Sequence, residues 1–153
     1  MAIDIQKFLE IFLGERGLHR THEKVLYVQF ILSSDEADYS FKNVFSGKRS
    51  AIFRLKQWFA TQNMPIPEIG YIIVLTDYFG QAHAVVEITD IKTVTYKNFT
   101  QEMALAAGVE GGDLDIWRAT RHDAIMADCE AMKIAFHEDI EIMAMWFDLL
   151  YPQ

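Results

Sequence analysis

The sequence predicts one domain that combines α-helices and β-strands. The chain has 153 residues, and a single domain usually has about 100 to 200. Apolar residues make up 51% of the chain and charged residues 24%, which is typical of a globular protein with its own core rather than of a disordered chain. Apolar residues recur with helical spacing in some segments and form strand-length runs in others. These observations together predict an α+β fold.

The chain begins with a predicted helix that is followed by a strand. Apolar residues at positions i, i+3, i+4, i+7 and i+8 predict a helix over residues 5–13. Asp4 is the expected N-cap of this helix, and Gly14 is its expected end. An apolar run rich in β-branched residues then predicts a strand over residues 25–32.

A second helix is predicted directly after this strand. Ser33 and Glu36 have the three-residue spacing of a capping box, and Gly47 is well placed to end a helix. This pattern predicts a helix over residues 34–46. Residues 49–59 begin as an extended segment, but their later part fits neither a helix nor a strand clearly.

The middle of the chain predicts a β-hairpin. Residues 64–67 contain two prolines and are expected to form a loop. Strands are predicted over residues 71–76 and 81–90, and Gly80 suits the left-handed position of the loop that joins them. Residues 93–96 form a further candidate strand.

Two more helices are predicted in the second half. Thr100 is the expected cap of a short helix over residues 101–107, and a longer helix is expected to start near Asp113. Trp117 and Cys129 recur on the apolar face of the longer helix, which predicts that both are buried. A single cysteine cannot form an internal disulfide, so we expect Cys129 to have a structural role.

The last segment, residues 140–151, fits both a helix and a strand by its apolar spacing. We find no internal repeat and no low-complexity tract, and no linker is long enough to divide the chain. The sequence therefore predicts one domain over residues 1–153, with residues 1–24 as a helical extension at its N-terminus.

Charge and hydropathy exclude several classes of protein. Fourteen basic and 22 acidic residues give a net charge of -8, which argues against general coating of nucleic acid. The longest apolar run covers residues 142–147, far fewer than the roughly 18 residues of a membrane span. Asp4, Lys7 and Glu10 interrupt what would be the apolar part of a secretion signal. We therefore expect a cytoplasmic protein without membrane contact.

The common catalytic and cofactor motifs are absent from the sequence. Its histidines have no metal-binding spacing, and no glycine-rich phosphate loop, dinucleotide fingerprint or nucleophile elbow is present. We expect no metal and no cofactor.

The charge is distributed unevenly along the chain. Residues 39–67 contain five basic residues and no acidic one, whereas residues 101–153 contain three basic and eleven acidic residues. The positive segment interleaves its bases with aromatic residues, a combination that can contact phosphate and stack on nucleobases. The same pattern also fits aromatic residues in the core beside a solvated charged edge, and both interpretations remain open.

Several motifs, taken in order, resemble the ASCH domain family. The resemblance covers about residues 30–151 and rests on residues 46–51 (SGKRSA), 67–71 (PEIGY), 84–89 (AVVEIT), 99–102 (FTQE), the glycine-rich loop that follows, 117–118 (WR) and 136–139 (FHED). It implies a PUA-like mixed β-barrel with flanking α-helices, and it implies that the last segment is a strand. Members of the family are thought to bind RNA or related ligands beside the barrel. Some resemble ribonucleases, and one branch consists of acetylcytidine amidohydrolases.

The catalytic pattern of the amidohydrolase branch is replaced in this chain. That pattern has a lysine, a threonine and a glutamate, and this sequence has Arg49, Ile52 and Ala107 at those positions. An arginine cannot act as a base near neutral pH. We therefore expect no amidohydrolase activity and no catalytic residue of this type, unless a shifted loop lets Glu110 replace the missing carboxylate. The family histidine is displaced too, because Arg121 occupies its position.

The resemblance leaves a set of candidate binding residues. These residues would supply cations, a hydroxyl, a carboxylate and aromatic rings, and they are Lys48, Arg49, Ser50, Arg54, Trp117, Arg118, Tyr27 and Glu110. The leading hypothesis is a binding module for RNA, a nucleotide or another small anion, in a local basic cleft around residues 48–54. One alternative is a ribonuclease or related enzyme that uses Arg49, Ser50 or His122. The other alternative is a protein interaction module that docks a basic partner through its acidic C-terminal third.

Overall fold

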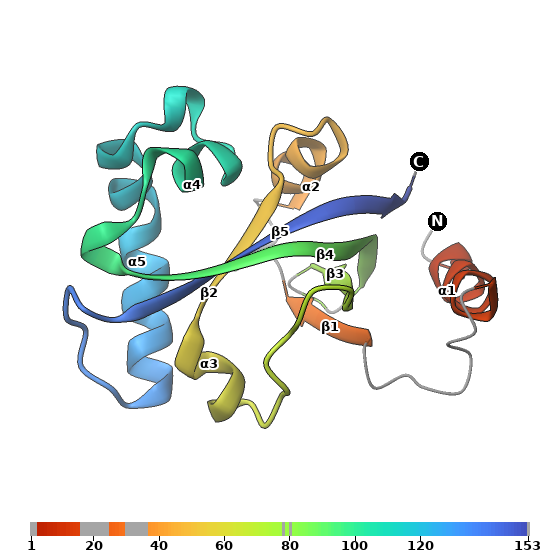
Figure 1. Cartoon of the computed structure of the whole chain (residues 1–153), viewed down its shortest axis with the longest axis horizontal. Coiled ribbons are helices and arrows are strands. Elements are labelled where there is room, and N and C mark those ends of the chain that lie inside the picture. Colours follow the sequence, from red (N-terminus) through yellow and green to blue (C-terminus); the bar gives the residue numbers. More distant parts are fainter. Residues whose placement is uncertain (1–2, 16–24, 30–36, 78, 80, 153) are drawn as a thin grey trace.

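Five strands form one curled sheet in the computed structural model, which describes residues 3–15, 25–29, 37–77, 79 and 81–152 (Figure 1). The order across the sheet is β1-β3-β4-β5-β2. β1 pairs with β3 in parallel, and the other neighbours are antiparallel. The strands are β1 (Val25–Gln29), β2 (Ala51–Leu55), β3 (Ile72–Thr76), β4 (Ala82–Thr95) and β5 (Glu141–Tyr151).

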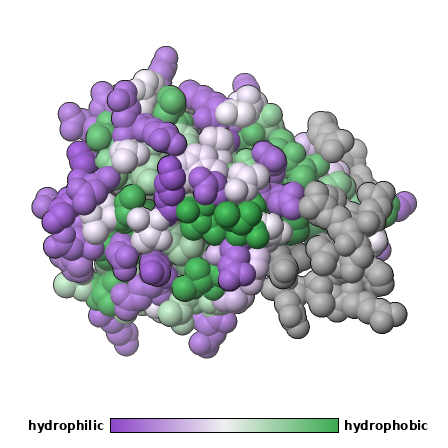
Figure 2. All heavy atoms as spheres, viewed as in Figure 1, coloured by the Kyte–Doolittle hydropathy of each residue, from purple (hydrophilic) through white to green (hydrophobic). Residues whose placement is uncertain are grey.

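Helices lie at both ends of the long β4–β5 pair. Figure 1 shows α4 and α5 at one end of this pair and α1 at the other. Polar side chains cover much of the α4–α5 end on the face shown in Figure 2. The helical elements are α1 (Ile3–Glu15), α2 (Ala37–Phe45), α3 (Lys56–Thr61), the 3-10 turn η3 (Tyr96–Asn98), α4 (Gln101–Ala106), the 3-10 turn η4 (Glu110–Gly112) and α5 (Leu114–Met132). No helix in the described part of the chain is long and apolar enough to span a membrane.

The described residues form three apolar clusters around the sheet. The first cluster joins one sheet face to Phe41 of α2 and Phe59 of α3. The second joins the other face to α4 and α5 and contains Trp117, Ile125 and Cys129, so the predicted burial of Trp117 and Cys129 is confirmed. In the third cluster, Ile5 and Leu9 of α1 pack on Ile72, Val74 and Val85. The sheet is therefore covered by apolar contacts on both faces.

β5 contributes side chains to both of the larger apolar clusters. Met143 and Met145 pack in the first cluster, and Ile142 and Ala144 pack in the second. A strand that is buried on both faces has an almost continuous apolar sequence rather than an alternating one. This is why apolar spacing alone fits a helix as well, and the strand implied by the family resemblance is confirmed.

Two of the predicted helix caps are present in the structure. Thr100 caps α4, because its hydroxyl accepts a hydrogen bond from the Met103 N–H at 3.1 Å. Asp113 caps α5, because its carboxylate accepts from the Asp115 and Ile116 N–H groups at 2.9 and 3.2 Å. Both predicted helix starts are confirmed. The proposed capping box of the second helix, Ser33 and Glu36, lies outside the described residues.

Some predicted boundaries were wrong. α1 already includes residue 3 and extends to residue 15, so Asp4 and Gly14 lie inside it instead of marking its ends. The segments predicted over 81–90 and 93–96 form a single strand, β4, which continues past a register shift between Ile88 and Asp90. A bulge of this kind bends a strand without ending its pairing.

The ambiguous segment 49–59 divides into two elements. β2 ends at Leu55 and α3 starts at the next residue, without an intervening loop. A segment that changes from strand to helix within a few residues gives no consistent period, which explains the unclear pattern.

The predicted hairpin between β3 and β4 is confirmed and is organised by Asp77. The buried Asp77 carboxylate accepts hydrogen bonds from the Phe79 and Gln81 N–H groups, both at 2.9 Å. It also lies 2.8 Å from His83 Nε2. The expected role of Gly80 lies outside the described residues. Burial would raise the pKa of the Asp77 carboxyl, but the hydrogen bonds with His83 and the two N–H groups outweigh it, so the pKa is lowered.

The Asp77→Asn substitution is expected to destabilise the protein by about 1 to 3 kcal/mol at pH 7, because an amide accepts these hydrogen bonds more weakly than a carboxylate. A lowered pKa in the folded state stabilises the fold above the unfolded pKa of about 3.9 and ceases to do so as the pH falls through the folded value. Urea unfolding of both proteins between pH 7 and pH 2 should therefore show the difference in stability shrinking below about pH 4. A difference that does not change with pH would contradict this role of the carboxylate.

A second prediction concerns two adjacent glycines in η4. Both have positive φ, +69° for Gly111 and +67° for Gly112. A Cβ added at Gly111 meets no atom within 4 Å, whereas one at Gly112 would lie 2.6 Å from the carbonyl oxygen of Gln101. Gly111→Ala should therefore lower the free energy of unfolding by about 1 to 2 kcal/mol, the cost of a left-handed backbone conformation for a residue with a Cβ. Gly112→Ala should lower it by clearly more, because the added Cβ also meets the Gln101 carbonyl oxygen. If thermal unfolding shows the same loss of stability for both variants, the predicted clash between residue 112 and Gln101 of α4 does not occur.

Candidate functional site

The segment between α2 and β2 is held by main-chain hydrogen bonds to three elements. Arg49 N–H donates to Asn43 O of α2 at 2.9 Å, and Ser50 N–H donates to Ala106 O of α4 at 2.9 Å. Ser50 O accepts from Phe147 N–H of β5 at 3.0 Å. These hydrogen bonds fix the direction in which each side chain of the basic segment leaves the backbone.

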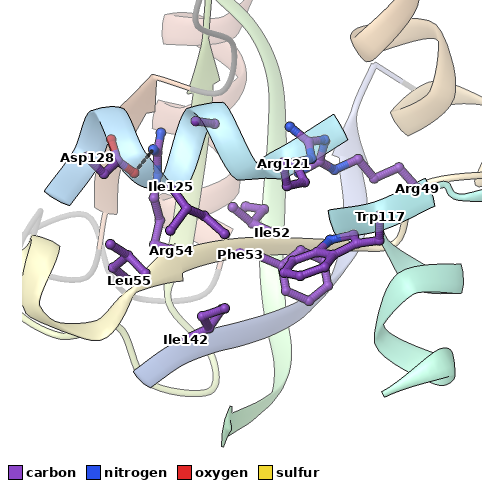
Figure 3. A pocket seen from close by; sticks show the side chains of 11 residues that line it. Arg49, Ile52, Phe53, Arg54, Leu55, Trp117, Arg121, Ile125, Asp128 and Ile142 are labelled. Carbon is purple, nitrogen blue, oxygen red and sulfur yellow. Dashed lines mark ion pairs between the residues drawn. The ribbon is translucent and has the colours of Figure 1, made fainter. Parts of the chain in front are cut away.

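A small cavity of about 70 Å³ lies between α5 and strands β2 and β5 (Figure 3). Three arginines line it: Arg49 precedes β2, Arg54 belongs to β2, and Arg121 belongs to α5. The rest of its wall is apolar, apart from one carboxylate. The other described residues around the cavity are Ile52, Phe53, Leu55, Trp117, Ala124, Ile125, Asp128 and Ile142.

The helical repeat places Arg121 in this cavity. Trp117, Arg121, Ile125 and Asp128 are separated by four, four and three residues, and this spacing places them on one face of an α-helix. The apolar members of this set pack against the sheet and thereby orient the arginine and the carboxylate toward β2.

Arg49 is almost completely buried, with 8% of its surface exposed. Its Nε donates a hydrogen bond to Ala51 O at 3.2 Å, which fixes the side chain beside β2. Burial, followed by the neighbouring Arg121 and Arg54, lowers the pKa of the Arg49 guanidinium. Arginine nevertheless keeps its proton in proteins. Arg49 therefore brings a full positive charge to a site with little water.

Arg54 lies at the other end of the cavity from Arg49 and Arg121. Its Nη1 is 3.8 Å from Asp128 Oδ2, and its guanidinium lies over the Trp58 ring at 4.8 Å from the centroid. Burial raises the pKa of the Asp128 carboxyl, and the positive charge of Arg54 only partly opposes this effect. In Figure 3 the side chains of Arg49 and Arg121 meet at one end, and the ion pair of Arg54 with Asp128 is at the other.

Trp117 belongs to both the core and the cavity wall. Its ring stacks on Phe99 at 3.7 Å between centroids, and only 2% of its surface is exposed. It also lines the arginine cavity. The sequence left open whether Trp117 packs in the core or lines the cleft, and the structure shows that it does both.

The other candidate residues are not in this cavity. Lys48, Ser50 and Glu110 line a separate, open groove of about 620 Å³ beside α4 and η4. Arg118 lies 5.8 Å from the centroid of the Tyr96 ring and borders neither space. Tyr27 belongs to β1, opposite Val74, and its side chain lies outside the described residues.

This separation affects the catalytic alternatives. Glu110 does not share the cavity of Arg49 and Ile52 in which it would have to replace the missing carboxylate. His122 is exposed on α5 and contacts Phe136 edge to face at 5.9 Å. The described residues that line the arginine cavity include no hydroxyl, thiol, amine or imidazole group. The described part of the chain also contains no group of three metal-ligating side chains. The cavity is suited to binding an anion.

Sequence reasoning missed Arg121 and Asp128 as members of the site. Arg121 was noted only because it occupies the position of the family histidine, and Asp128 was counted among the acidic residues of the C-terminal third. Their helical spacing from Trp117 was the signal that could have identified both.

Comparison with known proteins agrees with the fold. The ASCH domain model matches residues 27–151. An ASCH domain from Lactobacillus crispatus JV V101 superposes with a TM-score of 0.79 at 21% identity and covers 94% of this chain and 92% of its own. A protein from Enterococcus faecalis V583 also gives 0.79, at 18% identity, and covers 98% and 90%. No curated protein matches the sequence. The family match covers most of the chain, and the structure has the PUA-like α+β fold that the resemblance implied, so this protein belongs to the ASCH domain family.

Proposed function

We propose that this ASCH domain binds a small ligand by placing one phosphate or carboxylate group of that ligand in the arginine cavity. The observation that supports the proposal is the gathering of Arg49, Arg54 and Arg121 around one partly enclosed space. Guanidinium groups bind oxyanions through paired hydrogen bonds, and such charge-assisted bonds are stronger where water is scarce. Like charges repel one another, so an anion among them would relieve an existing repulsion.

The size of the cavity limits the part of the ligand that enters it. Complete sites for small molecules usually have about 300 to 1,000 Å³, whereas this cavity has about 70 Å³. That volume suits a single oxyanion group and is too small for a nucleobase. A nucleotide would therefore insert its terminal phosphate and leave its sugar and base at the mouth of the cavity.

Binding of a nucleotide or of an RNA end fits this geometry better than binding along an RNA strand. A phosphodiester carries a sugar on both sides, which hinders its entry into a narrow space. The net charge of -8 also opposes electrostatic attraction of a long polyanion. The ribonuclease alternative has less support, because Arg49, Ser50 and His122 lie on separate surfaces.

The first test of this function compares arginines on one helix. Arg121→Met should weaken binding of inorganic phosphate and of a nucleoside monophosphate by about tenfold, because hydrogen bonds to charged groups contribute about 1.5 to 3 kcal/mol. Arg118→Met, the same change on the same helix but outside the cavity, should leave binding unchanged. Isothermal titration calorimetry at low and moderate salt measures both effects, and thermal unfolding checks that each variant is folded. If the two variants bind phosphate with equal affinity, the arginine cavity is not the binding site.

The second test concerns the terminal phosphate. A short single-stranded RNA with a 5′-phosphate should bind at least about tenfold more tightly than the same RNA with a 5′-hydroxyl, because only the phosphorylated end offers guanidinium groups a charged, unhindered oxyanion. Fluorescence anisotropy with the label on the 3′ end measures the difference. If both RNAs bind equally, the phosphate does not enter the cavity, and binding along the strand becomes the better model.

A further inference from the structure

The open groove beside α4 and η4 has polar groups of opposite charge on two walls. Lys48 and Ser50, from the segment between α2 and β2, form its basic wall, and Glu102 of α4 and Glu110 of η4 form its acidic wall. Within the described part of the chain, none of these four side chains takes part in an ion pair or accepts or donates a hydrogen bond. The groove therefore presents polar groups that the fold does not use.

The two walls are joined by hydrogen bonds that fix their spacing. Ser50 N–H donates to Ala106 O of α4 at 2.9 Å, which ties the basic wall to the helix that begins the acidic wall. The Gln101 side chain donates to Gly111 O at 3.0 Å and so holds η4 on α4. The walls are rigidly placed before any ligand arrives, and such preorganisation lowers the entropic cost of binding.

Apolar surface lies between the charged walls. The half-buried Trp146 of β5 lines the groove together with Leu105 and Val109. Lys92 Nζ lies 5.5 Å from the centroid of the Trp146 ring, a cation–π contact that helps to hold the ring in place. Leu105 is 56% exposed, so the groove offers apolar contacts that the core leaves unused.

We infer that this groove is a binding site for a free α-amino acid with an aromatic side chain. The ammonium group of the ligand lies toward the acidic wall, its carboxylate lies toward Lys48 and Ser50, and its ring packs against Trp146. A ligand with only one charge gains from one wall and is repelled by the other, so the two walls favour a molecule that carries both charges. The inference does not rest on the proposed function, because the groove and the arginine cavity share no lining residue.

The size of the groove leaves the choice of ligand to its charges. Its volume of about 620 Å³ lies within the range of about 300 to 1,000 Å³ that is usual for small-molecule sites. Amines, carboxylates and amino acids of similar size would all fit. Discrimination among them therefore depends on the charged walls.

The first arm of the experiment compares ligands that differ by one group. L-phenylalanine is titrated into the protein at low salt and near neutral pH, and the amide NMR signals of the groove report binding. The matched ligands are 3-phenylpropanoate without the ammonium group, phenethylamine without the carboxylate, and L-alanine without the ring. L-phenylalanine should bind about fivefold more tightly than each of them, the upper range for one ion pair or aromatic contact at an exposed site.

The second arm changes one wall at a time. Glu110→Gln should weaken binding of L-phenylalanine and of phenethylamine by about threefold without weakening that of 3-phenylpropanoate, and Lys48→Met should have the converse effect. The control variants Glu130→Gln and Lys42→Met make the same changes in charge at exposed positions of α5 and α2 that do not line the groove. Both control variants should bind every ligand as the wild type does. Thermal unfolding confirms that each variant is folded.

Three results would overturn the inference. Equal affinity for L-phenylalanine and 3-phenylpropanoate would show that the acidic wall does not recognise the ammonium group. Equal effects of Glu110→Gln and Glu130→Gln would show that only the net charge of the protein matters. Groove signals that do not respond to L-phenylalanine would show that the groove does not bind it. None of these results bears on phosphate binding in the arginine cavity, which is measured separately.

Discussion

The packing of α5 against β2 and the start of β5 is the constraint on which the site depends. Trp117, Ile125 and Cys129 of the helix pack with Leu55 of β2 and Ile142 of β5. Burial of apolar surface contributes about 25 cal/mol per Å², so these contacts drive the helix against the strands. The arginines come together because they are attached to the two elements that this apolar contact joins.

Two residues that the family resemblance aligns with the amidohydrolase pattern line the arginine cavity. Arg49 and Ile52 line the cavity at positions where the amidohydrolase pattern has its amine and its hydroxyl, and Ala107 is buried at the end of α4. At these positions the chain has a cation and apolar side chains, which is why we expect no amidohydrolase activity of that type. Arg54 and Arg121 add two further cations to the cavity. The outcome is a site with the means to hold an anion.

Some local features of the fold, such as two helix caps, were predictable from the sequence, whereas features that depend on distant contacts were not. The caps Thr100 and Asp113 follow from a few neighbouring residues, and both are confirmed. The single strand β4 was read as two segments because its bulge is stabilised by pairing with β5, which lies far along the chain. β5 itself needed the family resemblance, because burial on both faces removes the alternation that identifies a strand.

The residues that line the arginine cavity could be named only in part from the sequence, because some of them meet through contacts between distant parts of the chain. The basic segment 48–54 supplies two of the three arginines of the cavity, but neighbours in sequence separate when the backbone turns at the start of β2. Arg49 and Arg54 border the arginine cavity, and Lys48 and Ser50 border the open groove. Which side chains share a cavity depends on α5, whose contribution became clear only with the packing in three dimensions.

The central claim is that Arg49 and Arg121 together hold one oxyanion, and NMR of the arginine side chains tests it most directly. Addition of inorganic phosphate to protein labelled with ¹⁵N should shift the Nε–H signals of Arg49 and Arg121 with one common binding curve, while the signal of Arg118 stays in place. Unchanged signals from Arg49 and Arg121, or a response confined to Lys48 and its groove, would contradict the account.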